Sequence, residues 1–219
     1  AMIKRGYRQS ENVEVFKGRG RFTGPKALAV EGFDEELTAE TTLIAAGTRP
    51  WVPDISGLDQ TPYLTSDEAL RLPEQPKRLT VIGGGYIAAQ SPHFFGALGT
   101  EVNIIHRRGQ MRREEDNDVA RRFTKVYQRR SNMILDAQVK RVPAQGEEIT
   151  VEVTTPDGKR SIPPDALLMA TGRVPNTDIL EVAHTSEALN QRGYINTDKY
   201  LQASVPGIWA RAILWGPTC

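Results

Sequence analysis

The sequence predicts an α/β fold in which a βαβαβ unit and a β-meander are flanked by β-rich segments, and three observations predict it. An apolar run at 79–82 ends in a glycine-rich turn, and helix-forming residues follow the turn. Two more apolar runs, at 101–106 and 133–135, come after helix-compatible stretches, as parallel strands joined by crossovers require. Short strand-type pieces bounded by Gly and Pro lie on both sides of this unit.

Composition and charge exclude several classes of protein. The chain has 219 residues, is 39% hydrophobic and 25% charged, and is expected to be a soluble protein with one large or two small domains. Its net charge of +1 gives no electrostatic reason for binding nucleic acid or an anionic membrane. No apolar run approaches the about 20 residues of a membrane span, and the N-terminus lacks the apolar core of a signal peptide. We therefore expect a cytoplasmic protein.

The cysteine and histidine content gives no reason to expect disulfides or metal sites. Cys219 is the single cysteine, so neither an internal disulfide nor a C-x-x-C site can form within one chain. The three histidines, His93, His106 and His184, lack the spacing of metal ligands. We expect no metal site.

The glycine-rich turn has the spacing G-x-G-x-x-A, formed by Gly83, Gly85 and Ala88. Gly83 permits the tight turn out of the strand, Gly85 lets a pyrophosphate approach the backbone, and Ala88 keeps the helix close to the sheet. The first turn of that helix offers unpaired N–H groups and a positive dipole end to phosphates. Together with the flanking strands, this spacing predicts a Rossmann-like site for a dinucleotide.

The segment before the glycine loop predicts an antiparallel meander, a proline-rich loop and one short helix. Turn residues separate four strand-type pieces, which are 13–16, 18–22, 27–30 and 42–46. Pro50, Pro53 and Pro62 mark the loop. Ser66 is the expected N-cap of a helix over 66–70.

Two helices are expected within the βαβαβ unit. The first, over 85–98, contains Pro92, which removes one backbone donor and clashes with the carbonyl of Ala88, so we expect a kink or a shortened first segment. Asp116 or Asn117 caps the second helix. The apolar face of that helix carries Val119, Phe123, Val126 and Tyr127.

The remaining sequence predicts a second meander and a final buried strand. Residues 156–158, Pro-Asp-Gly, form a hairpin turn between strands at 149–153 and 160–162. The run 166–170 is uniformly apolar, as expected for a strand that is covered on both faces. One more strand is expected at 207–210.

Five motifs, in order along the chain, resemble those of the flavin disulfide reductases, the class I pyridine nucleotide-disulfide oxidoreductases. This family includes dihydrolipoyl dehydrogenase, glutathione reductase, mycothione reductase and mercuric reductase. The resemblance runs from about Val13 to Trp209, and its motifs lie at 45–50, 66–70, 81–89, 170–176 and 197–210.

The resemblance implies that residues 77–175 form the NAD(P)-binding domain and that 1–76 and 176–219 are incomplete parts of an FAD-binding domain. Complete members also carry an FAD-binding glycine loop, a C-x4-C redox disulfide and a dimerisation domain with a His-Glu pair, none of which this sequence contains. We expect hydride transfer from nicotinamide to flavin in the complete enzyme, and neither a catalytic residue nor activity in this chain alone. FAD binding is not expected either, because Ile213 replaces the aspartate of the last family motif.

The resemblance also implies roles for single residues around the nicotinamide. Tyr86 matches a tyrosine that shields the flavin and moves aside for nicotinamide, although it can equally be a packing aromatic. Ile87 lies beside it in the same motif. Gln90 replaces a family glutamate that supports a lysine near the flavin, which weakens the redox interpretation. Gly172 matches a position whose backbone approaches the nicotinamide.

The end of the second parallel strand favours NADP over NAD. NAD enzymes commonly place an acid there for the ribose hydroxyls, whereas this segment has none between His106 and Glu114. The resemblance aligns Arg107 and Arg113 with phosphate-reading arginines of glutathione reductase, and a guanidinium fork suits phosphate. The alternative is a solvated basic loop.

Three interpretations of the whole chain remain open. It is the NAD(P)-binding portion of a flavin disulfide reductase, or a free-standing, non-catalytic nucleotide-binding or interaction module derived from that family, or a subunit that completes a flavin site with another chain. Ala1 before Met2 favours an excised piece, whereas Gln90, Pro92 and Ile213 favour loss of function. The flanking strands are expected to leave open edges, so we expect a homodimer or a strand-exchanged oligomer.

Overall fold

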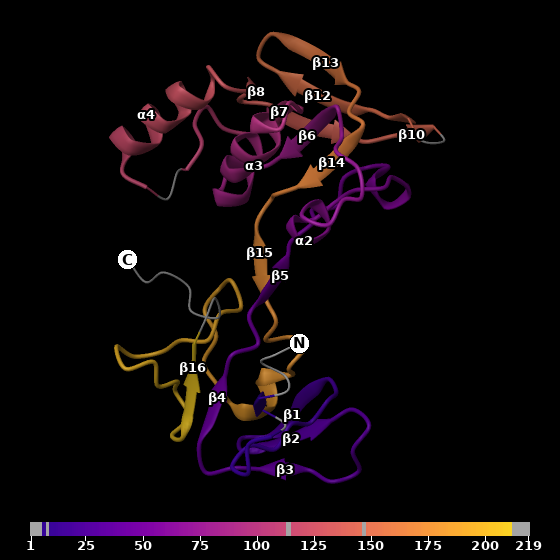
Figure 1. Ribbon diagram of the computed structural model, residues 1–219. Coiled ribbons are helices and arrows are strands. Elements are labelled where there is room, and N and C mark those ends of the chain that lie inside the picture. Colours follow the sequence, from indigo (N-terminus) through magenta and orange to yellow (C-terminus); the bar gives the residue numbers. More distant parts are fainter. Residues whose placement is uncertain (1–5, 8, 113–114, 146–147, 212–219) are drawn as a thin grey trace. The chain divides into compact units, whose positions relative to one another are not determined.

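The structure is a computed structural model that describes residues 6–7, 9–112, 115–145 and 148–211 (Figure 1). The chain forms two compact units. One unit is continuous and spans Pro50–Arg173, whereas the other is formed by both ends of the chain, Ala1–Arg49 and Val174–Cys219. The chain passes from one unit to the other at two short strands that pair with each other, β5 (Thr48–Pro50) and β15 (Arg173–Pro175).

A four-stranded parallel sheet is the centre of the continuous unit. Its strands are β6 (Arg78–Ile82), β7 (Glu101–Ile105), β8 (Asn132–Ile134) and β14 (Ala166–Met169). Their order across the sheet is β14-β6-β7-β8, and all three neighbouring pairs are parallel. This sheet confirms the expected strands and the α/β fold class. Its strands are uniformly apolar, as in Ala166–Met169, because they are covered on both faces.

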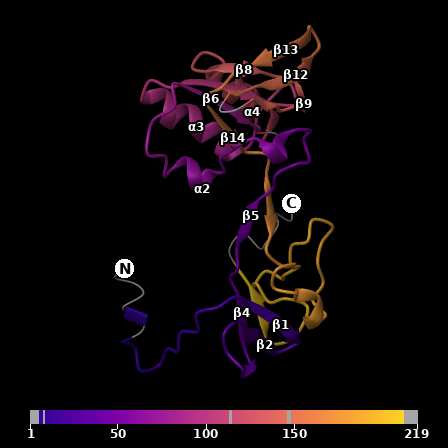
Figure 2. The same cartoon turned by 90° about the vertical axis from the view of Figure 1, so that its right-hand side faces the viewer.

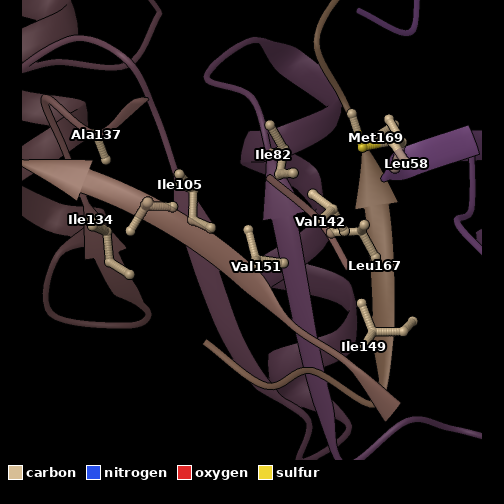
Figure 3. Close-up of a cluster of buried hydrophobic side chains, with 11 residues drawn as sticks. Leu58, Ile82, Ile105, Ile134, Ala137, Val142, Ile149, Val151, Leu167 and Met169 are labelled. Atoms are coloured by element: carbon tan, nitrogen blue, oxygen red, sulfur yellow. The ribbon is translucent and has the colours of Figure 1, made fainter. Parts of the chain in front are cut away.

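The two faces of the parallel sheet bury different sets of side chains. Leu79 and Val81 of β6 pack in one cluster with Phe95 of helix α3 (Tyr86–Ala97). Ile82 of the same strand packs in a second cluster with Val151, on the opposite face (Figure 3). Figure 2 accordingly shows α3 on one side of β6 and strand β12 (Val151–Thr155) on the other. The alternation of strand side chains therefore places helices on one face and a second sheet on the other.

The second sheet of this unit is antiparallel, in the order β13-β12-β9. It comprises β9 (Gln138–Arg141), β12 (Val151–Thr155) and β13 (Gly158–Ile162), and a separate two-stranded pair, β10 (Ala144–Gln145) and β11 (Glu148–Ile149), lies between them in sequence. The predicted hairpin is confirmed, since Thr155 pairs with Gly158 across the turn.

Helix α3 continues past Pro92. The helix is assigned without interruption from Tyr86 to Ala97, so the shortened first segment does not occur. Pro92 is buried, and so are Ala88 and Phe95 of the same helix. Burial of this face offsets the about 3 kcal/mol that an interior proline costs a regular helix.

Helices α4 and α2 each have a side-chain N-cap. Helix α4 (Asn117–Tyr127) is capped by Asp116, whose Oδ1 accepts a 2.9 Å hydrogen bond from the N–H of Asp118. Helix α2 (Ser66–Ala69) is capped by Thr65, and the prediction that Ser66 is its N-cap is wrong. Thr65 fits because the T-x-x-E spacing lets Glu68 accept a 2.7 Å hydrogen bond from the Thr65 N–H, which completes a capping box.

The segment 50–76 belongs to the continuous unit. Its 3-10 helix η1 (Leu58–Gln60) buries Leu58 in the same cluster as Leu167 of β14. The backbone of Leu64 is bonded to β14 on both sides, donating to the carbonyl of Leu167 at 2.7 Å and accepting from Met169 at 2.8 Å. The domain boundary expected between residues 76 and 77 therefore lies inside the continuous unit, which begins at Pro50.

The unit formed by the chain ends contains two small sheets. Strands β1 (Gly20–Gly24), β2 (Ala27–Val30) and β3 (Leu37–Thr38) form the expected antiparallel meander. The piece 42–46, expected as the last strand of this meander, instead gives β4 (Thr42–Ile44), which pairs in parallel with β16 (Ile208–Ala210). The 3-10 helix η2 (Val182–Thr185) packs against the same core as Phe22 and Ile44, and the piece 13–16 forms no strand.

Candidate nucleotide-binding site

The carboxyl ends of three parallel strands are bonded together around the glycine loop. The N–H of Gly83 donates to the carbonyl of Ile105 at 3.0 Å, which ties the loop to the end of β7. The N–H of Ala170 donates to the carbonyl of Ile82 at 2.8 Å, which ties the end of β14 to β6. In open α/β sheets, ligands bind at this edge.

Gly83 occupies a position that a side chain cannot share. Its φ is +148°, which L-residues rarely adopt, and a Cβ there would lie 2.1 Å from the carbonyl oxygen of Ala170. At Gly84 a Cβ would lie 2.4 Å from the imidazole ring of His106, a side chain that would have to move. The loop therefore lies against β14 on one side and His106 on the other.

Gly85 has the opposite environment, with open space where a Cβ would be. It is the N-cap of α3, has an ordinary φ of −87° and meets no heavy atom within 4 Å of an added Cβ. No side chain accepts a hydrogen bond at this cap. The first turn of a 12-residue helix thus presents backbone N–H groups beside open space, which suits a phosphate group.

The remaining predicted site residues lie in three places. On α3, Ala88 is fully buried against the sheet, Ile87 is half-buried and Gln90 is exposed. After β7, His106 is half-buried and Arg107 is exposed, whereas Arg113 lies outside the described residues. After β14, the carbonyl of Gly172 accepts a 3.0 Å hydrogen bond from the N–H of Trp51.

Tyr86 has two partners that the sequence did not indicate, Arg112 and Glu115. The hydroxyl of Tyr86 donates to Oε1 of Glu115 at 2.5 Å, and Nη2 of Arg112 forms an ion pair with the same oxygen. The Cζ of Arg112 lies 3.0 Å from the centroid of the Tyr86 ring. We call these three residues the Tyr86 cluster. The hydrogen bond to Glu115 raises the pKa of Tyr86, and the bonds from Tyr86 and Arg112 lower the pKa of Glu115.

The backbone of Arg112 explains how this cluster forms. Arg112 has a φ of +56°, unusual for a residue other than glycine, and its N–H donates to the carbonyl of Gly84 at 3.0 Å. The loop after β7 therefore turns back to the glycine loop. A possible signal in the sequence was the i,i+3 spacing of Arg112 and Glu115.

A groove of about 340 Å³ lies between α3 and α4 beside this cluster. Its walls combine the charged and polar groups of the cluster with aromatic and aliphatic side chains, and the lining residues are Tyr86, Ala89, Gln90, Arg112, Glu115, Val119, Phe123 and Tyr127. The apolar face predicted for α4 therefore lines this groove in part.

Neither a metal cluster nor a membrane-spanning helix is found in the described part of the chain. No group of three or more His, Cys, Asp or Glu side chains there could hold a metal ion. Within the same residues, no helix combines the length and the apolar character needed to cross a bilayer.

Comparison with known proteins gives consistent matches over most of the chain. The family model for pyridine nucleotide-disulphide oxidoreductase matches residues 3–211. A glutathione reductase of Burkholderia cepacia is 36% identical over 203 residues, which cover 92% of this chain and 44% of that protein. A dihydrolipoyl dehydrogenase of Vibrio parahaemolyticus is 31% identical, with 94% of this chain and 44% of that protein covered.

A solved structure agrees with these sequence matches. The HOCl-induced flavoprotein disulfide reductase RclA from Escherichia coli superposes with a TM-score of 0.85 at 29% identity, covering 96% of this chain and 48% of that one. The chain thus spans about half the length of the relatives it matches, or less. With the family model matched over residues 3–211, the chain belongs to the pyridine nucleotide-disulphide oxidoreductase family.

Proposed function

We propose that this chain binds a nicotinamide dinucleotide at the carboxyl edge of its parallel sheet, as the nucleotide-binding portion of a flavin-dependent disulfide reductase. The observation that carries the proposal is the contrast between two glycines of one loop. Gly83 is pressed against backbone, whereas Gly85 opens onto space at the start of a long helix. A tight turn followed by an open helix N-terminus is the arrangement that accommodates a pyrophosphate.

The residues of the chain fit such a ligand in three ways. The N–H groups of the first turn of α3 bind phosphate oxygens, since no side chain caps them. The exposed Arg107 after β7 offers a cation to a 2′-phosphate, so we propose NADP in preference to NAD. The exposed Tyr86 stands at the entrance of α3, where it covers or admits the nicotinamide. When bound, the nicotinamide supplies a hydride, which the complete enzyme passes to flavin.

The proposal extends to the context of the chain. Because the chain covers less than half of each relative's length, we infer that it acts together with the parts that those relatives have in addition and is inactive alone. FAD binding by this chain is not part of the proposal. A single cysteine fits a reducing compartment, so we propose a cytoplasmic location.

The test is calorimetric titration with NADPH and NADH at low salt, where interactions with phosphate are strongest. We expect NADPH to bind more tightly than NADH, and Arg107→Ala to weaken NADPH about tenfold because a charge-assisted hydrogen bond is lost. NADH binding should hardly change. Arg108→Ala is the matched control, since it removes the adjacent exposed arginine.

Two results would contradict the proposal. Absence of heat with either nucleotide, from protein that circular dichroism shows to be folded, would refute nucleotide binding and favour a non-catalytic interaction module. Equal losses of affinity in Arg107→Ala and Arg108→Ala would show only a general effect of charge, and the assignment of Arg107 would be wrong.

A further inference from the structure

The Tyr86 cluster places a paired cation beside the glycine loop. The backbone N–H of Arg112 is bonded to the carbonyl of Gly84, so the side chain of Arg112 begins next to the loop proposed to bind phosphate. That side chain is 6% exposed and forms an ion pair with Glu115. The positive charge of Arg112 is therefore paired with an acid in this conformation.

One oxygen of Glu115 holds two groups at once. Oε1 accepts from the hydroxyl of Tyr86 and from Nη2 of Arg112, and the guanidinium of Arg112 lies on the face of the Tyr86 ring. The ring and the guanidinium are thus fixed against each other by a single carboxylate. Removing the negative charge of Glu115 weakens both interactions, whereas removing either partner alone leaves the other in place.

We propose that Glu115 is a specificity-determining residue, which limits the preference for NADPH over NADH by holding Arg112 against Tyr86. The inference rests on the proposed function and deepens it. The 2′-phosphate of NADPH is a doubly charged group with three acceptor oxygens, so it competes with the Glu115 carboxylate for the Arg112 guanidinium. NADH has no such group and gains nothing from release of Arg112.

Competition of this kind has a defined consequence for affinity. The conformation in which Arg112 is released from Glu115 binds the 2′-phosphate, and the intact cluster lowers the population of that conformation. A change that weakens the ion pair between Glu115 and Arg112 increases the fraction of molecules in which Arg112 is released. The NADPH affinity rises by the same factor as this fraction. A freed Tyr86 ring acts on the nicotinamide, which both nucleotides share, so the ratio of the NADPH affinity to the NADH affinity is the quantity that reports the competition for Arg112.

The experiment is calorimetric titration of Glu115→Gln with NADPH and NADH. The substitution keeps the size of the side chain and removes its charge, and we expect the ratio of the NADPH affinity to the NADH affinity to rise about fivefold. Asp118→Asn is the matched control, because Asp118 also forms an i,i+3 ion pair, with Arg121, on the same stretch of chain. This control should change the binding of neither nucleotide by more than about twofold.

A double variant tests whether Glu115 acts through Arg112. In an Arg112→Gln background, Glu115→Gln should no longer raise the NADPH affinity. If Arg112→Gln does not fold, ultraviolet titration of the tyrosines in Glu115→Gln, with Tyr86→Phe as blank, gives a second measure. In Glu115→Gln the pKa of the Tyr86 hydroxyl should be lower than in the native protein, because the carboxylate that accepts its hydrogen bond is gone.

The outcomes separate this inference from the proposed function. If the native chain binds NADPH and Glu115→Gln matches Asp118→Asn, or strengthens NADPH and NADH equally, the role of Glu115 is refuted and the nucleotide site stands. Weaker NADPH binding in Glu115→Gln would also overturn it, since Glu115 would then orient Arg112 for binding. If no protein binds either nucleotide, both proposals fail.

Discussion

Replacing Gly83 and Gly85 by alanine, one at a time, should give opposite results although the two glycines are two positions apart. At Gly83 the new Cβ would lie 2.1 Å from the carbonyl oxygen of Ala170 and 2.6 Å from its carbonyl carbon. These are backbone atoms at the end of β14, so they can move only if the strand shifts. The positive φ adds strain of about 1–3 kcal/mol, and forced overpacking costs a similar amount. We expect Gly83→Ala to lose about 2–6 kcal/mol of stability.

Gly85→Ala should keep the fold and lose the ligand. Its φ of −87° suits alanine and its Cβ meets no atom within 4 Å, so the stability should change by less than about 1 kcal/mol. The added methyl group lies where the pyrophosphate would approach. Nucleotide affinity should therefore fall although the protein stays folded. Gly96→Ala, inside α3 and also in open space, is the control that should gain about 0.5–1 kcal/mol without affecting binding.

Hydrogen–deuterium exchange read by mass spectrometry suits this comparison, because it reports on each unit separately. Peptides from β6 and β14 should lose protection in Gly83→Ala and keep it in Gly85→Ala. Peptides from β1 and β2, in the other unit, serve as the internal control. Equal protection of β6 and β14 in the two variants would refute the steric argument.

Three more predictions concern stability and assembly. Arg78 at the start of β6 donates hydrogen bonds to Asp165 and so lowers the pKa of the Asp165 carboxyl group. This interaction stabilises the fold above the ordinary Asp pKa, and its contribution is lost as the pH falls through the lowered pKa. In urea unfolding, the difference in stability between the native protein and Asp165→Asn should therefore disappear in acid. Asp116→Ala should cost about 1 kcal/mol by removing the cap of α4, whereas Asp116→Asn should be nearly neutral in the same assay. Strands β4 and β16 form a sheet of two strands and leave Leu43 61% exposed, so we propose that the protein forms a homodimer or a strand-exchanged oligomer. Analytical sedimentation should detect this oligomer, and Leu43→Lys should weaken it. A monomer at tens of micromolar would contradict the proposal.

The parallel sheet and the glycine loop could be predicted from the sequence because their signals are local. A strand covered on both faces needs an uninterrupted apolar run, and Leu167 and Leu168 are fully buried as their run predicted. Gly83 precedes a helix at the spacing that a tight strand-to-helix turn requires, and its conformation is one that only glycine adopts readily. In both cases a few neighbouring residues determine the structure.

Three features could not be predicted, because they depend on contacts between distant residues or on a choice between near-equal alternatives. Strands β4 and β16 pair although they are far apart in the sequence, and no local pattern in either segment indicates its partner. The Tyr86 cluster depends on the positive φ of Arg112, which returns the loop to Gly84. Thr65 and Ser66 are both good caps, and the position of Glu68 decided between them.

The parallel pairing of β4 with β16 also determines the order in which the chain can fold during synthesis. The unit Pro50–Arg173 is continuous, so it can fold as soon as it has left the ribosome. The unit that holds β4 cannot be completed until Ile208–Ala210 has emerged, and pairing between such distant segments is slow. During that interval β16 is not available to pair with β4, so the apolar residues of β4 are more open to chaperones, proteases and aggregation than they are in the completed unit.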